Sequence, residues 1–332
     1  MKKAFRIILI VVVVLAIIAA SGILFVRYTF PKVDKAPAIT LNRTTDQVKR
    51  GEYLANHVAV CIDCHSTRDW SRFSAPPIAG TAGKGGDMFD HSMGFPGVLY
   101  AKNITSDKET GLGNWTDGEI YRAITSGVSR DGEPLFPLMP YMAYNQMAED
   151  DLHAIIAYVR TLAPVKNSVK QSQIDFPVNL IMRTMPGKHT PVSKPALNDS
   201  VATGKYLFTI AGCTGCHTPE GDAEGKFLAG GAEFKFPSGA TLRSANITPD
   251  KETGIGNWTE QAFVQRFKSA AKPEATAQKL TPDAFNTVMP WSMYGGMAEE
   301  DLRAIYKYLR SVEPVKNKVE KFTPAPKSIA KK

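Results

Sequence analysis

The stretch Cys61-Ile62-Asp63-Cys64-His65 returns 152 residues later as Cys213-Thr214-Gly215-Cys216-His217, and the two copies contain all four cysteines of the chain. Two thiols one helical turn apart can add to the two vinyl groups on one edge of a porphyrin. The histidine that follows is then carried under the ring, where its imidazole can bind the iron as the proximal ligand. The sequence therefore predicts two covalently attached haem c groups, bound through Cys61, Cys64 and His65 and through Cys213, Cys216 and His217.

Two other kinds of site also use a Cys-x-x-Cys pair. A thioredoxin-like redox pair needs no adjacent histidine, and a zinc site needs four ligands gathered in one cluster. Because both stretches end in histidine and occupy equivalent positions of an internal repeat, described below, covalent haem is the interpretation that the pattern favours.

An apolar run near the N-terminus predicts a membrane anchor. Residues 7–26 are uncharged, follow three basic residues and end at Arg27. Twenty residues at about 1.5 Å rise match a hydrocarbon core of roughly 30 Å. By the positive-inside rule, residues 1–27 predict a single pass through the inner membrane, with the haem domains on the periplasmic side. The alternative is a cleaved signal peptide, for which Ala19-Ala20-Ser21 is an acceptable cleavage site.

The formal net charge of +8 is concentrated at the two ends of the chain. Residues 1–27 contribute +4 and residues 314–332 contribute +5, which leaves −1 for everything between them. A nucleic-acid-binding protein needs a basic face on its folded domain. The sequence therefore predicts no nucleic-acid partner.

The chain contains an internal repeat. Residues 103–117 match residues 246–260 at 12 of 15 positions, and Met139-Pro140 returns as Met289-Pro290. Each copy is about 120 residues long, enough for one core that a haem helps to fill. The predicted organisation is an anchor at 1–27, a tether at 28–44, a first domain at 45–167, an inter-domain linker at 168–197, a second domain at 198–318 and a basic tail at 319–332.

Helical signals dominate both copies. Thr116 and Glu119 form a capping-box pair that predicts a helix start. An apolar stripe at i, i+3, i+4 and i+7 predicts the last helix of each copy, although only alanine (Ala148 or Ala298) stands at its N-cap. Its members are Leu152, Ile155, Ile156, Val159 and Leu162 in the first copy and Leu302, Ile305, Tyr306, Leu309 and Val312 in the second. The segments between helices are rich in Gly and Pro and lack strand alternation, so we expect an all-α fold wrapped around cofactors.

Met139 and Met289 are the candidate sixth ligands of the two irons. They occupy equivalent repeat positions, 74 and 72 residues after their histidines. The proline that follows each one favours an extended backbone from which the side chain can be presented. A thioether ligand gives a six-coordinate site suited to electron transfer. The alternative, a methionine that fills the core, does not account for the equivalent positions.

Several other residues were weighed for a role at the haems. Trp115 and Trp258 are candidates to hydrogen-bond a haem propionate, or else to anchor the core. Asn103 and Asn246 are candidates to brace the loop that contains each Trp. The remaining histidines have no counterpart in the other copy and are predicted to be ordinary loop or surface residues: His57, His91, His153 and His189.

These motifs together resemble the cytochrome c subunits of bacterial membrane-bound alcohol, aldehyde and gluconate dehydrogenases, over residues 45 to 318. The resemblance rests on Cys-x-x-Cys-His, on the Asn-Ile-Thr to Trp block, on Met-Pro and on the last helix; residues 176–183 resemble that family's linker. It implies two class I cytochrome c domains, with axial pairs His65/Met139 and His217/Met289. It also implies electron transfer from a dehydrogenase toward quinone or a terminal oxidase. Those subunits usually carry three haems and anchor differently.

The expected function is that of a membrane-tethered dihaem electron carrier with no small-molecule substrate, whose partners are dehydrogenase or respiratory-complex subunits. It can be a mobile shuttle or a subunit fixed in a complex. The alternative is a dihaem enzyme, such as a peroxidase or a thiosulfate-oxidising cytochrome, against which the two equivalent Met-Pro pairs argue. The tether contains Pro31 and Pro37, and a flexible chain of that length would span on the order of 20–25 Å.

Overall fold

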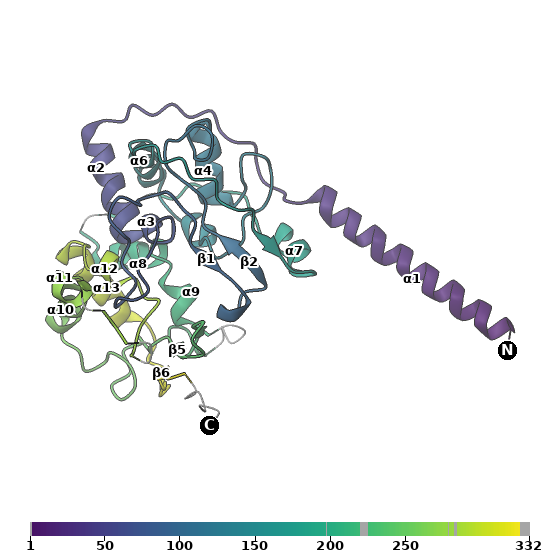
Figure 1. Ribbon diagram of the computed structural model, residues 1–332. Helices are drawn as coiled ribbons and strands as arrows, with labels where there is room; N and C mark the ends of the chain where they lie inside the picture. The colour runs from purple at the N-terminus through teal and green to yellow at the C-terminus, as the bar shows by residue number, and fades with distance from the viewer. Residues whose placement is uncertain (1, 197, 220–224, 278, 282–283, 326–332) are drawn as a thin grey trace, which may run out of the picture.

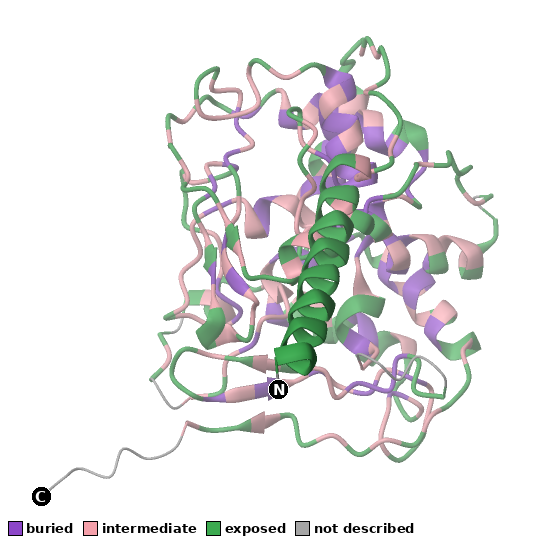
Figure 2. Cartoon of the chain, turned by 90° about the vertical axis from the view of Figure 1, so that its right-hand side faces the viewer, coloured by how far each residue is buried: buried purple, intermediate pink, exposed green. Residues whose placement is uncertain are grey.

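The computed structural model describes residues 2–196, 198–219, 225–277, 279–281 and 284–325. Helix α1 (Lys2–Thr29) projects from the body, and none of its residues is buried (Figures 1 and 2). Among the described residues it is the one helix long and apolar enough to cross a membrane. The rest of the chain folds into one body that contains both repeats.

A pair of packed helices forms the frame of each repeat. In the first repeat α2 (Thr45–Tyr53) packs on α6 (Glu149–Val159), and in the second α8 (Ser200–Ile210) packs on α13 (Glu299–Ser311). The predicted apolar stripes form the buried faces of α6 and α13, and acidic first turns suit their helix dipoles.

Glycine permits the close approach of the two helices in each frame. A Cβ added to Gly51 would lie 1.8 Å from the carbonyl oxygen of Ala154, and one added to Gly204 would lie 1.9 Å from that of Ala304. No side chain fits at either position, so both repeats depend on the same backbone contact.

Shorter helices carry the motifs. The predicted capping box is confirmed, because Thr116 accepts from Glu119 N while the Glu119 carboxylate accepts from Thr116 N. The helices of the first repeat are the π-helix η1 (Leu54–Val58), α3 (Cys61–Cys64), the 3-10 helix η2 (His91–Met93), α4 (Asp117–Ser126) and α5 (Tyr141–Tyr144). Those of the second are α9 (Cys213–His217), α10 (Glu260–Ala270), α11 (Pro273–Ala277) and α12 (Trp291–Tyr294), and α7 (Val178–Ile181) and the 3-10 helix η3 (Met182–Thr184) lie between the repeats.

Two small antiparallel sheets accompany the helices, which the all-α expectation did not include. The first contains β1 (Met88–Phe89), β2 (Gly97–Tyr100) and β3 (Gln173–Ile174), and the second contains β4 (Glu233–Lys235), β5 (Thr241–Arg243) and β6 (Phe322–Thr323). Strands of two to four residues are too short to show alternation in a sequence. The third strand of each sheet comes from the predicted linker or the predicted tail, so parts of both segments are folded onto the repeats.

The two repeats pack against each other through reciprocal tyrosines. Tyr206 donates to Asp151 Oδ2 (2.8 Å) and accepts from Ala148 N (3.1 Å). In the same way Tyr53 donates to Asp301 Oδ2 (2.5 Å) and accepts from Ala298 N (3.1 Å). Each tyrosine therefore caps the last helix of the other repeat, which explains why alanine is sufficient at both N-caps.

The tether is docked on the body rather than free. Ile39 and Leu41 pack against the core, and Arg43 pairs with Asp117 at 3.4 Å. A Cβ added to Gly118 would lie 1.8 Å from the carbonyl oxygen of Pro37. The expectation of a flexible tether is therefore wrong, because its apolar residues have found a surface on which to pack.

Candidate haem-binding sites

A residue in the left-handed conformation begins each Cys-x-x-Cys-His turn. Val60, with φ +47°, precedes Cys61, and Gly212, with φ +70°, precedes Cys213. The reversal ends the preceding helix and starts a new one whose first residue is the first cysteine. Cys61 and Cys64 are both half-buried and lie one turn apart on α3, as attachment to one porphyrin edge requires.

The proximal histidines are oriented by the same contact in both repeats. His65 Nδ1 lies 2.6 Å from Lys102 O, and His217 Nδ1 lies 2.8 Å from Ala245 O. A carbonyl only accepts, so Nδ1 carries the hydrogen and Nε2 keeps its lone pair for a metal. Burial also lowers the pKa of both imidazoles, which favours the neutral form that binds iron.

The predicted sixth ligands lie in equivalent loops. Met139 and Met289 are both half-buried and pack against the hydrophobic core. The carbonyl of Met139 accepts from Tyr141 N (2.7 Å), and that of Met289 accepts from Trp291 N (2.8 Å). Each loop leads directly into a short helix, α5 or α12.

Tyrosines on those short helices hold each methionine loop near the cysteines of its own repeat. Tyr144 donates to Ala59 O at 2.7 Å, and Tyr294 donates to Ala211 O at 2.7 Å. Ala59 and Ala211 each stand two residues before the first cysteine. The structure thus brings the cysteine, histidine and methionine segments of each repeat together around one core, and this arrangement fits a covalent haem with histidine and methionine ligands.

Ser74 of the first repeat supports the methionine loop of the second. Its side chain donates to Met289 O (2.7 Å) and accepts from Trp291 N (2.8 Å), and its own N–H donates to Asn286 Oδ1 (3.0 Å). Ser74 is 3% exposed. In the part of the chain that the structure describes, no residue of the second repeat makes such a hydrogen bond to the Met139 backbone.

The sequence analysis missed Ser74, although the sequence contains a signal. The Asn-Ile-Thr block starts 38 residues after His65 but only 29 residues after His217. The nine additional residues belong to the loop that contains Ser74. An insertion in one copy of a repeat therefore marked the segment that crosses to the other copy.

The Asn-Ile-Thr block and the repeated Pro-Val-Lys-Asn segment form one network. Asn103 Nδ2 donates to Val165 O (2.8 Å), and Asn246 Nδ2 donates to Val315 O (2.7 Å). Asn167 then donates to Lys84 O (2.8 Å), in the loop that follows the first haem motif. The predicted bracing role of Asn103 and Asn246 is confirmed.

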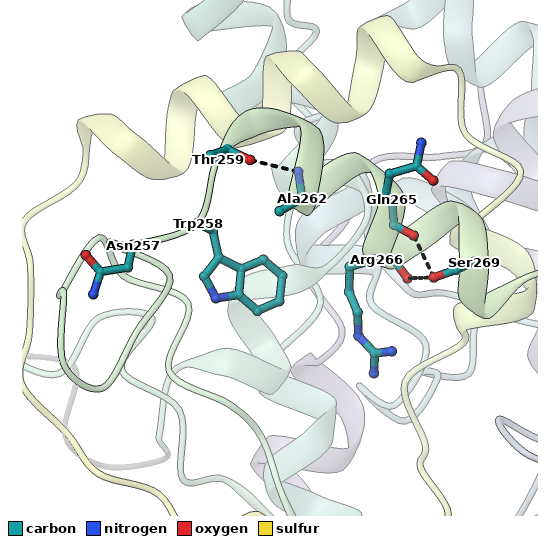
Figure 3. Close-up of a pocket in the computed structure, with 7 residues that line it drawn as sticks. All are labelled: Asn257, Trp258, Thr259, Ala262, Gln265, Arg266 and Ser269. Carbon is teal, nitrogen blue, oxygen red and sulfur yellow. Dashed lines mark hydrogen bonds between the residues drawn. The ribbon is translucent and has the colours of Figure 1, made fainter.

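The two tryptophans of these blocks differ in exposure. Trp115 is half-buried and packs against the core, whereas Trp258 is 38% exposed, so the core-anchor interpretation is wrong for Trp258. Trp258 lies in an open hollow of about 410 Å³ (Figure 3), lined by Asn257, Trp258, Thr259, Ala262, Gln265, Arg266 and Ser269. The Arg266 guanidinium also lies 4.5 Å from the ring centroid of Trp291, so the hollow adjoins the Met289 loop. An interaction of either Trp with a haem propionate stays a prediction.

The remaining histidines are not all surface residues. His57 lies in η1, where its Nδ1 is 2.9 Å from Met293 O of the other repeat, so the prediction of an ordinary loop or surface residue is wrong for it. His91 pairs with Asp175 at 2.7 Å on the surface. His153 and His189 are half-buried and lie beside the ring of Tyr121.

The alternative sites fit the structure less well. Burial raises the pKa of Cys61 and Cys64 to about 12, whereas a reactive redox pair needs a lowered thiol pKa. Among the described residues, no three His, Cys, Asp or Glu side chains are grouped so as to hold a metal ion, as a zinc site would require.

Comparison with known proteins agrees with the geometry. Residues 201–313 match the cytochrome c family. This chain is a member of that family. It is 31% identical over 278 residues to the fructose dehydrogenase cytochrome subunit of Gluconobacter japonicus, covering 80% of this chain and 52% of that protein. It is 30% identical over 281 residues to the gluconate 2-dehydrogenase cytochrome c subunit of Pantoea cypripedii, covering 80% and 59%.

A third relative is closer in length. The chain is 26% identical over 286 residues to a diheme cytochrome c-type protein of Cereibacter sphaeroides, covering 82% of this chain and 88% of that protein. By contrast, the chain spans little more than half the length of the dehydrogenase subunits. The predicted resemblance is confirmed, and a cytochrome c domain implies covalent haem c and electron transport.

Proposed function

We propose that this protein is a membrane-anchored dihaem c-type cytochrome. It accepts electrons from a dehydrogenase or a quinol-oxidising partner and passes them to a downstream acceptor or oxidase. The observation that carries the proposal is the equivalence of the two sites. Each has a Cys-x-x-Cys-His turn, a histidine fixed through Nδ1 to a backbone carbonyl, and a Met-Pro loop held by a tyrosine. A bound haem c supplies one-electron chemistry at each site, and its ligands there are His65 with Met139 and His217 with Met289.

The packing of the repeats supports electron transfer between the two sites. Helix α5 contacts α8, and α12 contacts η1, so each methionine segment lies against the helix that precedes the other repeat's cysteines. A Cβ added to Gly212 would lie 3.9 Å from Pro140, which places the residue after Met139 beside the residue before Cys213. This arrangement suits a protein that moves electrons through both haems.

The position in the cell follows from α1 in this proposal. The apolar helix spans the inner membrane, its basic N-terminal flank lies in the cytoplasm, and the haem body lies on the periplasmic side. The docked tether favours a body held at the membrane over one that swings on a leash. Similarity to subunits of dehydrogenases supports a dehydrogenase as the partner.

Removal of α1 tests the anchor. A chain that lacks residues 1–27 and is exported behind a cleavable signal should be a soluble, haem-loaded periplasmic protein, because the body buries its own core. The full chain should require detergent for extraction. Cell fractionation with haem staining measures both. A full-length protein found free in the periplasm would mean that the apolar run is a cleaved signal.

Ser74→Ala tests the support of the second methionine loop. The substitution leaves the Met289 carbonyl and the Trp291 N–H with fewer partners, and an unpaired buried group costs about 1–3 kcal/mol. We expect the sulfur-to-iron near-infrared band of the second haem to weaken and to disappear at a lower temperature than in the unmodified protein. A Met139→Ala background leaves that band as the only one.

Ser71→Ala is the matched control for Ser74→Ala. Ser71 lies in the same loop, but its hydroxyl donates to the exposed Asp69 carboxylate at 2.6 Å and does not reach the Met289 loop. Equal thermal loss of the band in the two variants would show that Ser74 does not support Met289.

A further inference from the structure

The segment at residues 176–185, which includes α7 and η3, exposes apolar side chains on one part of the body. Phe176 is 69% exposed, Ile181 56% and Met185 38%. Three large apolar side chains within ten residues form a patch that water solvates poorly. Nothing in the electron-transfer role of the haem sites uses these residues.

This patch lies where the apolar helix meets the body. Both α7 and η3 contact α1, and Figure 1 shows α7 beside the base of that helix. Arg183 fixes the junction, because its Nη2 donates to Phe30 O (3.1 Å) while Nη1 pairs with Glu133 at 2.7 Å. A further ion pair joins Asp34 of the tether to Lys188 at 2.8 Å.

The end of α1 sets the level of the membrane surface. Tyr28 is 81% exposed near the end of the helix, and tyrosine is enriched at the headgroup level of membranes. Since the 176–185 segment contacts the same end, it lies at the same depth. Its apolar side chains therefore continue the apolar surface of α1 sideways along the membrane plane.

We propose that residues 176–185 bind the interfacial region of the phospholipid bilayer that α1 spans, with Phe176, Ile181 and Met185 inserted among the headgroups and upper acyl chains. The proposal rests on the proposed anchoring by α1. A short apolar segment beside a spanning helix adds a second point of attachment. Two attachment points hold the body against the membrane with one face toward it.

Spin labels in the full-length holoprotein test this arrangement. With all four native cysteines bonded to haem, an introduced cysteine is the single free thiol. Ile181→Cys reports on the segment and Val13→Cys on the interior of α1. Val201→Cys, at a 41% exposed apolar position in α8, is the matched control. Each variant is placed without other proteins in a phospholipid nanodisc. Its collisions with lipid-soluble oxygen and with a water-soluble nickel chelate are then compared by electron paramagnetic resonance.

The label at Ile181 should show an oxygen-to-nickel ratio severalfold higher than the label at Val201, and close to that of lipid-exposed sites. A label at Phe176 provides a second reading if the Ile181 variant is not matured. If Val13 reads lipid but 176 and 181 read water like Val201, the segment does not bind lipid, and a protein partner covers it or nothing does. If Val13 also reads water, the anchor itself fails, and this proposal fails with it.

Discussion

Cys61→Ser combined with Cys64→Ser should leave a protein that retains one covalent haem after denaturation, where the unmodified chain retains two. The two thioether bonds of the first haem can form only at these thiols, because the other two cysteines belong to the second motif. Mass spectrometry of the denatured protein counts the haems directly. Cys213→Ser with Cys216→Ser is the matched experiment in the other repeat. Two haems on either double variant would contradict the assignment.

The consequences of the two double variants should differ for the haem that is retained. On the sequence alone the repeats would be independent units joined by a linker, but the structure places Ser74 against the Met289 loop. Loss of the first haem disturbs the loop after His65 and therefore the support of Met289. We expect the second haem to show a weakened methionine band in the Cys61/Cys64 variant. The reciprocal variant should affect the Met139 band less.

Met139→Ala and Met289→Ala should each convert one haem to a high-spin or weakly ligated form that binds carbon monoxide rapidly when reduced. The thioether favours ferrous iron, so its loss should lower the potential of that haem, by on the order of 0.1–0.3 V out of the roughly 0.8 V range that axial ligands span. Near-infrared absorption, carbon monoxide difference spectra and redox titration measure the three effects.

Met142→Ala is the control for the ligand variants. Met142 stands three residues beyond Met139, is 52% exposed and has no methionine at its repeat equivalent. It should leave both haems low-spin and both potentials unchanged. A wild-type protein that already has a high-spin or bis-histidine haem and turns over peroxide would replace the carrier proposal with the enzyme alternative.

Local patterns in the sequence were enough to predict the haem motifs, the repeat, the apolar helix and the last helix of each copy. Cys61 and Cys64 are one turn apart by their spacing alone, and the stripe of α6 is a period that any window of the sequence contains. The capping box at Thr116 is likewise complete within four residues. Each of these features depends on residues that are neighbours in the chain.

Only the tertiary structure decided how the two repeats support each other. Tyr53 caps a helix 245 residues away, and Ser74 holds a loop 215 residues away. Neither residue belongs to a local pattern, because a tyrosine or serine forms such bonds only after the chain has placed a partner beside it. The strands β3 and β6 and the docked tether are of the same kind. Short apolar segments show no period, and they become ordered only because the folded body provides a surface for them.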